Sequence, residues 1–162
     1  MSDPADWDIA VSVLTGDWSD ADEGVVRLAA QAALKAAGPD GPLELSVALA
    51  DDGKVRELNR DYRGQDKPTN VLSFEAGEDP MPGQPLILGD VVLARETCAR
   101  EAVEGDKSFN DHLTHLTVHG VLHLLGYDHI DSDEAEEMEA LEVEILAEMG
   151  IGNPYLEKPE AV

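Results

Sequence analysis

Hydrophobic and polar residues alternate over short stretches of the chain, which is the pattern of β-strands that bury one face. The alternation is clear over residues 8–14 and again over 43–49, and shorter apolar runs at 71–74 and 86–93 fit two further strands. Residues 75–85 hold two glycines and three prolines, so they predict a loop between the last two strands. The pattern therefore predicts a small β-sheet of about four strands.

Helices are predicted where apolar residues recur at every third or fourth position. This spacing predicts a helix over residues 20–37, with Asp20 as its N-cap and with Gly38 and Pro39 at its end. Four more helices are predicted, over residues 52–62, 95–104, 109–125 and 133–149.

The order of these elements favours one fold class. Strands early in the chain and helices late favour an α+β fold, in which one small mixed β-sheet is flanked by helices. A length of 162 residues suits a single domain, which we expect to span residues 1–152. Residues 153–162 include two prolines, and we expect them to form a flexible C-terminal tail.

The chain is strongly acidic, but its charge is unevenly placed. It has 35 acidic and 11 basic residues and a net charge of −24, which excludes a generally basic nucleic-acid coat protein. Residues 131–150 contain nine acids and no Lys or Arg, whereas five of the eleven basic residues lie between Lys54 and Lys67. This basic segment is the place in the chain that best suits an anionic ligand, although composition alone favours a helix surface of mixed charge.

Cysteine content and hydropathy indicate the compartment. The one cysteine, Cys98, excludes a disulfide within the chain and a cluster of thiolate metal ligands. The first ten residues lack the basic and apolar regions of a secretory signal peptide, and no apolar run reaches the roughly 18 residues of a membrane-spanning helix. We therefore expect a cytoplasmic protein with no membrane partner.

All five histidines lie between residues 112 and 129. His119 and His123 are four residues apart, which places their imidazoles on one helix face, one turn apart. Gly126 can end that helix, so that the chain turns back and brings His129 to the same place. Three neutral imidazoles leave one tetrahedral position open, as in a catalytic zinc centre. The sequence predicts one Zn²⁺ per chain at the end of a central helix, although nickel, cobalt or iron suit the same ligands.

Metzincin proteases share this histidine spacing, but their signature places a Glu, the general base, directly after the first histidine. Gly120 occupies that position here, so the usual proton acceptor of peptide hydrolysis is absent. A water molecule bound to zinc can still ionise near neutral pH. His112 and His115 precede the pair on nearly the same face. They could support the metal ligands from behind, face the substrate or be solvated, and solvation is the favoured interpretation; His115 is also a candidate to contact substrate.

Several segments resemble one family. HGVLHLLGYDH at 119–129 closely resembles the signature of the YbeY family, bacterial zinc-dependent endoribonucleases that act in ribosomal RNA maturation. LNRDYRGQDKPTNVLSF at 58–74 resembles the arginine-containing segment of that family, and LGDVVL at 88–93 resembles its following strand. DSDEAEEMEALEVEIL at 131–146 resembles its last helix. Together these segments cover most of residues 58–149.

The resemblance implies a function as well as a fold. It implies an α+β domain, zinc at His119, His123 and His129, and a functional arginine at Arg63. Family members are linked to 3′-end maturation of 16S rRNA, to ribosome quality control and to the small ribosomal subunit and its proteins. We therefore expect a single-strand-specific endoribonuclease that acts on the 16S rRNA precursor and not on DNA. A zinc-bound water or a zinc-polarised phosphate would drive phosphodiester cleavage.

In this interpretation Arg63 and His119 are catalytic, and Arg63 binds phosphate through its planar fork. Without the resemblance, a surface salt bridge from Arg63 to Asp61 or Asp66 is the simpler interpretation. Further residues are candidates to contact the RNA or to support the metal ligands from behind. The RNA-contacting candidates are Arg60, Lys67, Ser73 and His115, and the supporting candidates are Asp90, Asp128 and Tyr127. We expect Asp90 to be buried, where it would orient a ligand histidine or a basic residue, or cap a bulge. Asp128 could equally cap the segment that follows it.

The net charge opposes RNA binding, because phosphate contacts come from basic side chains. We therefore expect a cationic groove between residues 54–67 and the zinc, with the acidic residues 131–150 on another face. Two alternatives stay open. A metallopeptidase is favoured by the ligand spacing and disfavoured by Gly120. A non-catalytic ribosome-assembly factor stabilised by zinc is disfavoured because structural zinc usually has four protein ligands.

Overall fold

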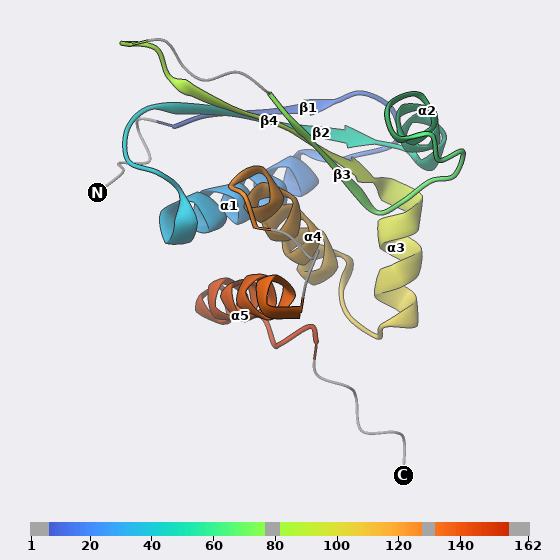
Figure 1. The fold of residues 1–162 in the computed structure, drawn as a ribbon. Helices are drawn as coiled ribbons and strands as arrows, with labels where there is room; N and C mark the ends of the chain where they lie inside the picture. The colour runs from blue at the N-terminus through green and yellow to red at the C-terminus, as the bar shows by residue number, and fades with distance from the viewer. Residues whose placement is uncertain (1–6, 77–81, 128–131, 156–162) are drawn as a thin grey trace.

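The computed structural model describes residues 7–76, 82–127 and 132–155, which form one four-stranded sheet and five helices (Figure 1). The predicted α+β class and the mixed sheet are confirmed, and each predicted element lies within one residue of its expected limits. The strands are β1 (Trp7–Val13), β2 (Leu43–Ala50), β3 (Val71–Glu75) and β4 (Leu86–Ala94). The helices are α1 (Asp20–Ala37), α2 (Asp52–Arg63), α3 (Arg95–Glu104), α4 (Phe109–Leu124) and α5 (Ser132–Glu148).

The sheet has the strand order β1-β2-β4-β3. β1 pairs with β2 and β2 pairs with β4 in parallel, whereas β3 pairs with β4 in the antiparallel direction, with Ser73 opposite Val91. β3 is thus an edge strand of the described sheet. Its outer edge carries backbone groups that β4 does not use, and other partners can bind such groups.

A β-bulge at the start of β4 changes which side chains face the helices. The register between β2 and β4 shifts by one residue at Gly89, so Leu88 and Val91 both face the main core. Gly89 has φ +133°, and a Cβ there would lie 2.0 Å from the Phe74 carbonyl oxygen. Asp90 consequently points away from that core and is exposed. The expectation that Asp90 is a buried carboxylate behind a metal ligand is therefore wrong.

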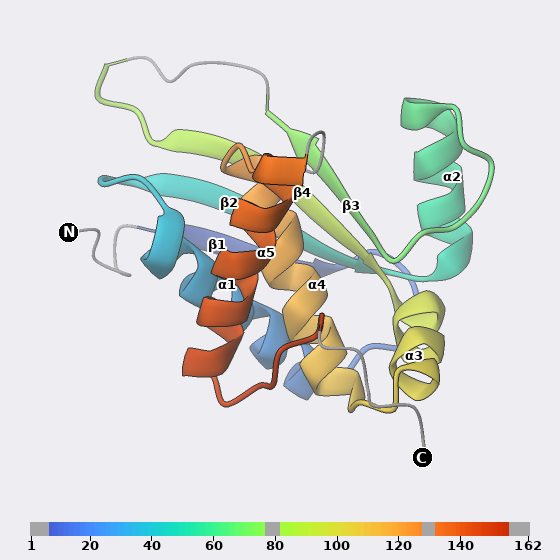
Figure 2. The same cartoon turned by 60° about the horizontal axis from the view of Figure 1, so that its bottom comes forward.

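Helices cover the two faces of the sheet unequally (Figures 1 and 2). α1 and α4 pack against one face, and α5 packs on α4 and α1 further from the sheet. α2 lies on the other face, where Val55 and Leu58 contact a smaller cluster that includes Leu72 and Val92. α4 is buried along most of its length and runs beside β3 and β4. This packing brings the histidine helix next to the free edge of the sheet.

The N-terminus of α1 differs in one detail from the prediction. Ser19, not Asp20, is the N-cap, because the Ser19 hydroxyl accepts a hydrogen bond from the Asp22 amide at 3.2 Å. The Asp22 carboxylate in turn accepts one from the Ser19 amide at 3.0 Å, which completes a capping box. Asp20 lies inside the first turn, where its charge interacts favourably with the helix dipole.

No helix in the described part of the chain combines the length and the apolar character needed to cross a membrane.

Candidate active site

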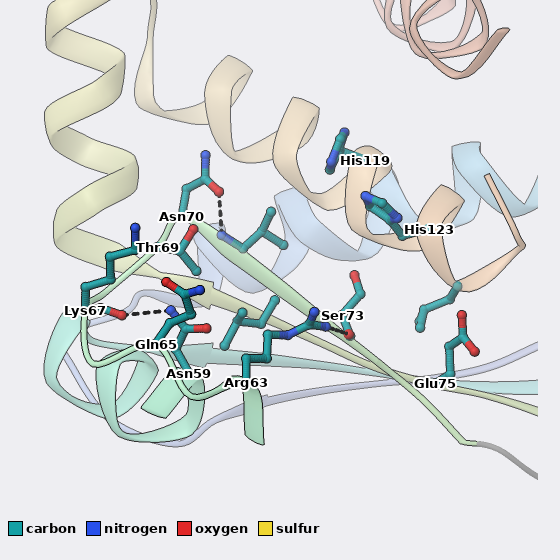
Figure 3. Close-up of a pocket in the computed structure, with 13 residues that line it drawn as sticks. Asn59, Arg63, Gln65, Lys67, Thr69, Asn70, Ser73, Glu75, His119 and His123 are labelled. Carbon is teal, nitrogen blue, oxygen red and sulfur yellow. Dashed lines mark hydrogen bonds between the residues drawn. The ribbon is translucent and has the colours of Figure 1, made fainter. Parts of the chain in front are cut away.

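A groove of about 500 Å³ opens between α4 and the edge strand β3 (Figure 3). The end of α2 and the loop that follows it form the third wall. Arg63 and Lys67 lie on the loop side, and His119 and His123 lie on the opposite side, on α4. Two segments more than 50 residues apart in the sequence therefore line one cavity, which is the arrangement that the predicted cationic groove requires.

The two described histidines of the predicted trio are neighbours. The ring centroids of His119 and His123 lie 4.8 Å apart, as expected for residues one helical turn apart. The third predicted ligand, His129, and the predicted supporting residue Asp128 lie outside the described residues. Within residues 7–76, 82–127 and 132–155, no group of three or more His, Cys, Asp or Glu side chains is placed to hold a metal ion. The ligand set therefore stays a prediction.

A buried carboxylate from α5 holds the first histidine. Nδ1 of His119 lies 2.5 Å from Oε1 of Glu142, whose side chain is completely buried. The Tyr155 hydroxyl donates a hydrogen bond to the other oxygen of Glu142, and His115 Nε2 lies 3.5 Å from it. Burial raises the pKa of the Glu142 carboxyl, but the hydrogen bonds with His115, His119 and Tyr155 outweigh burial and hold the pKa well below its usual range. Glu142 is therefore an ionised acceptor.

This contact makes His119 suitable as a metal ligand. An ionised carboxylate only accepts hydrogen bonds, so the hydrogen between it and the ring belongs on Nδ1 of His119. The other ring nitrogen, Nε2, then keeps its lone pair. Metal-bound histidines in proteins commonly have such a carboxylate on their second nitrogen. The residues present thus fit a divalent cation that prefers nitrogen ligands.

Arg63 is the basic residue whose guanidinium reaches over the edge of the sheet. Its Nη2 donates a hydrogen bond to the Ser73 carbonyl oxygen at 2.7 Å, and the guanidinium lies 5.6 Å from the centre of the Phe74 ring. The salt-bridge alternatives from the sequence are not formed. Asp66 pairs with Arg56 and Asp61 pairs with Arg60, at 2.8 and 3.1 Å. Among the described residues, no carboxylate forms an ion pair with Arg63, although Glu75 lines the same groove.

Two asparagines that the sequence analysis did not single out hold the loop wall. Asn59 Nδ2 donates to the Lys67 carbonyl at 2.9 Å, which closes the loop after α2. Asn70 Nδ2 donates to Glu101 at 3.1 Å, and Glu101 also contacts Nε2 of His112 on α4 at 2.9 Å. The loop and the histidine helix are therefore tied to the same carboxylate on α3. Asn59 could have been found from the sequence, because it is a polar residue on the stripe of α2 that is buried.

Ser73 and Gly120 set the distance between β3 and α4. The Ser73 hydroxyl donates to the Gly120 carbonyl at 3.0 Å. A Cβ on Gly120 would lie 2.8 Å from Val91 Cγ1 and 3.2 Å from both Ser73 Oγ and Val71 Cγ2. The position that carries the general base in zincin proteases thus faces a packed sheet and has no room for a glutamate.

A sequence model described as "Endoribonuclease YbeY" matches residues 15–150 of the chain. The chain belongs to the YbeY family. The Endoribonuclease YbeY of Paramagnetospirillum magneticum is 54% identical over 159 residues, which cover 93% of this chain and 97% of that relative. That of Parvibaculum lavamentivorans is 53% identical over 148 residues, or 86% and 80% of the two chains. The solution structure of TM1509 from Thermotoga maritima has a similar fold, with a TM-score of 0.56 at 22% identity over 95% of this chain and 99% of that one.

The YbeY-family match includes Arg63, His119, His123 and Glu142, but it ends before Tyr155. Glu142 and Tyr155 were both missed from the sequence. Glu142 had a signal, because it lies on the apolar inner stripe of the last predicted helix. Tyr155 had none, because it was assigned to the tail 153–162. That tail stays a prediction for residues 156–162, which lie outside the described part of the chain.

Several other predicted site residues lie away from the groove of this YbeY-family protein. His115 does not line it, because its ring lies between His119 and Tyr155 with only 12% of the side chain exposed. Tyr127 lines a separate pocket beside α5. Arg60 is exposed and pairs with its neighbour Asp61. Solvation, the favoured interpretation of His112 and His115, is wrong, because Glu101 and Glu142 contact them where only 7% and 12% of their side chains are exposed.

Proposed function

We propose that this YbeY-family protein is a metal-dependent endoribonuclease specific for single-stranded RNA. We further propose that it acts in the cytoplasm on the 16S rRNA precursor, in 3′-end maturation and in ribosome quality control. One observation carries the proposal. An arginine with no carboxylate partner among the described residues and a pair of histidines line opposite sides of one groove. A phosphodiester in that groove would meet both.

The proposed cation is one Zn²⁺ per chain, held by His119, His123 and His129. The contact between His119 and Glu142 supports the assignment, because it leaves Nε2 of His119 as a lone-pair donor. When bound, the cation would supply positive charge that polarises a phosphoryl oxygen and lowers the pKa of water.

Arg63 would bind the scissile phosphate. A guanidinium presents parallel N–H groups to two phosphate oxygens, and its charge stabilises the negative charge that grows on those oxygens. The hydrogen bond to Ser73 aims the guanidinium along the edge of β3, and the contact with Phe74 supports its plane. Lys67, at the other end of the loop wall, would guide the neighbouring phosphate.

The ribosome would help to hold the RNA. A chain of net charge −24 repels a polyanion over long distances, so Arg63 and Lys67 supply a local attraction only. We therefore propose that proteins of the small ribosomal subunit present the 16S precursor to the groove. A partner that fixes the RNA near the site raises its effective concentration without stronger contacts to the enzyme.

A metallopeptidase is the second candidate, because the free edge of β3 beside α4 could pair with an extended peptide. Gly120 weighs against it, since a glutamate at that position would collide with Val91 and Val71. The test of the proposed function therefore includes a protein substrate.

The deciding experiment compares zinc-loaded protein on three substrates, namely single-stranded RNA, duplex RNA and casein. We expect cleavage of the single-stranded RNA alone. The His119→Ala variant should lose both zinc, measured by elemental analysis, and cleavage. Cleavage of casein would favour the peptidase. A preparation with stoichiometric zinc that cleaves no substrate would favour the non-catalytic assembly factor. Wild-type zinc content in His119→Ala would remove His119 from the ligand set.

The cellular part of the proposal has its own test. Cells depleted of the protein should accumulate 16S precursor with an immature 3′ end, and wild-type protein but not His119→Ala should restore the mature end. Normal 16S ends in the depleted cells would contradict the proposed substrate while leaving the enzymatic activity to the assay above.

A further inference from the structure

Four side chains from three segments form a closed network behind His119. Oε1 of Glu142, on α5, lies 2.5 Å from Nδ1 of His119 and forms a hydrogen bond with it. Its Oε2 accepts from the Tyr155 hydroxyl and lies 3.5 Å from His115 Nε2. His115 Nε2 is also 3.2 Å from the Tyr155 oxygen. Both carboxylate oxygens of a fully buried glutamate are thus engaged, and one faces a candidate metal ligand.

We propose that Glu142 is a positioning residue that fixes the ring orientation and tautomer of His119, and that Tyr155 in turn fixes Glu142. The inference rests on the proposed function, because it presumes that His119 binds the metal. It adds Glu142 and Tyr155 to the functional residues, although neither would contact the metal or the RNA.

The geometry explains why His119 needs such a partner. Its side chain lines the groove and is 20% exposed, so packing alone does not fix the ring. A neutral imidazole can carry its hydrogen on either nitrogen, and only the tautomer with hydrogen on Nδ1 has a lone pair on Nε2 with which to bind a cation. The Glu142 carboxylate selects that tautomer before any metal arrives. It also holds the ring in one rotamer, which lowers the entropy lost on binding.

Tyr155 connects the chain beyond α5 to this site. The Tyr155 amide donates to Asn153 Oδ1 at 2.8 Å, which forms a tight turn beyond α5. The Tyr155 ring packs edge-on against His115, with centroids 5.4 Å apart. Burial and the bond to Glu142 raise the pKa of the Tyr155 hydroxyl, so it keeps its hydrogen and acts as a donor. Without it, Oε2 of Glu142 would keep only the longer contact with His115.

The first measurement uses metal-free protein. Side-chain ¹⁵N NMR distinguishes the two tautomers of a histidine, and we expect His119 to carry its hydrogen on Nδ1. In Glu142→Gln the amide can donate to Nδ1 as well as accept from it, so a mixture of tautomers is expected. Glu144→Gln is the matched control, because it makes the same change on an exposed position of α5. It should leave the His119 signals unchanged.

The second measurement is zinc affinity by chelator competition. Loss of such a supporting carboxylate typically weakens metal binding by about 10- to 100-fold, and we expect this range for Glu142→Gln. Tyr155→Phe keeps the ring and removes one hydrogen bond, so we expect a loss of up to about tenfold. Glu144→Gln should bind zinc as the wild type does.

The outcomes separate this inference from the function on which it rests. A wild-type chain that binds no zinc would overturn both. Normal zinc binding by the wild type with equal affinity in folded Glu142→Gln would overturn the positioning role alone. If Glu142→Gln does not fold, Tyr155→Phe decides, and wild-type affinity and tautomer in that variant would remove Tyr155 from the network. A wild-type His119 with its hydrogen on Nε2 would overturn the inference directly.

Discussion

Arg63 and Arg60 lie one turn apart near the end of α2, yet their surroundings differ. Arg60 is paired with Asp61, whereas Arg63 reaches to the Ser73 carbonyl at the edge of the groove. An arginine held by a carbonyl keeps its full charge for a ligand, while one held by a carboxylate does not. The two residues therefore form a natural pair for testing which basic side chain contacts RNA.

We predict that Arg63→Gln lowers the rate of RNA cleavage by about 10²- to 10³-fold, the usual effect of removing one donor to transition-state charge. Zinc content should be unchanged, because Arg63 contacts neither histidine in the described residues. Arg60→Gln removes the same charge and should change the rate less than threefold or so. Equal losses in both variants would mean that net charge, rather than the Arg63 contact, controls cleavage.

His112 gives the protein a pH dependence of stability. Burial lowers the pKa of His112, and the hydrogen bond with Glu101 opposes burial only in part. The unfolded chain then binds a proton more readily than the folded one, so stability is complete above the usual pKa of about 6.5 and declines as the pH falls below it. The pKa of the Glu142 carboxyl is also lowered. Its contribution to stability is therefore lost only at more acidic pH, below its usual pKa of 4.5.

We predict that urea unfolding of metal-free protein gives lower stability at pH 5.5 than at pH 7, and that His112→Gln reduces this difference. The variant should also be less stable at pH 7, because it loses part of the packing around His112. A His112→Gln variant with an unchanged pH slope would exclude His112 as the source of the effect. Arg63 and His112 thus control two separable properties, one catalytic and one structural.

The spacing between α4 and β3 decides whether the histidines and Arg63 can act on one phosphate. Two helical glycines test this spacing. A Cβ at Gly120 would lie 2.8 Å from Val91 Cγ1, whereas a Cβ at Gly24 in α1 would meet no atom within 4 Å. Both alanine variants gain the same intrinsic helix propensity, worth about 1 kcal/mol. Any difference between the two variants therefore reports packing against the sheet.

We predict that Gly24→Ala stabilises the protein by up to about 1 kcal/mol, while Gly120→Ala destabilises it by about 1–3 kcal/mol through overpacking. The buried Val91 side chain on β4 is branched and stiff, so α4 must move away from the sheet, including β3. RNA cleavage should fall in Gly120→Ala at temperatures where the variant is still folded, and it should be normal in Gly24→Ala. Denaturant unfolding and cleavage assays check both effects. A stabilised Gly120→Ala variant would show that the interface has room.

The secondary structure could be predicted because each element satisfies local rules. β2 alternates, and α1 ends at Gly38 before a proline. Local rules failed where one element depends on another. The bulge at Gly89 reverses the side on which Asp90 lies, and alternation alone assumes an unbroken pleat.

The candidate site was predictable in part. The helical spacing of four residues placed His119 and His123 together, and the groove beside Arg63 was expected from charge and resemblance. The burial of His115 was not predictable, because its partner Tyr155 is 40 residues away in sequence. The position of Glu142 on an apolar stripe was a usable signal, since a buried acid requires a partner.

The distribution of charge over the whole molecule limits how RNA can approach. Exposed acidic residues lie along α5. This helix packs on α4 and α1 and contributes no residue to the wall of the groove. Arg63 and Lys67 lie on the opposite wall from α4. At physiological salt the Debye length is about 8 Å, so exposed acids beyond that distance from the RNA hardly act on it, whereas at 0.01 M salt it is about 30 Å. Salt therefore separates local attraction from global repulsion.

We predict that the binding of single-stranded RNA depends only weakly on salt concentration. The binding is measured with metal-free protein, because the RNA then stays intact. Two phosphate contacts give a slope of about −1.4 in log K against log salt, and Lys67→Gln should reduce its size by about 0.7. Repulsion from the acidic surface makes the slope shallower at low salt. A triple variant, Glu136→Gln, Glu137→Gln and Glu144→Gln, should bind RNA more tightly near 0.01 M salt and equally at 0.15 M. Tighter binding by the triple variant at 0.15 M would place the path of the RNA along α5 rather than along β3.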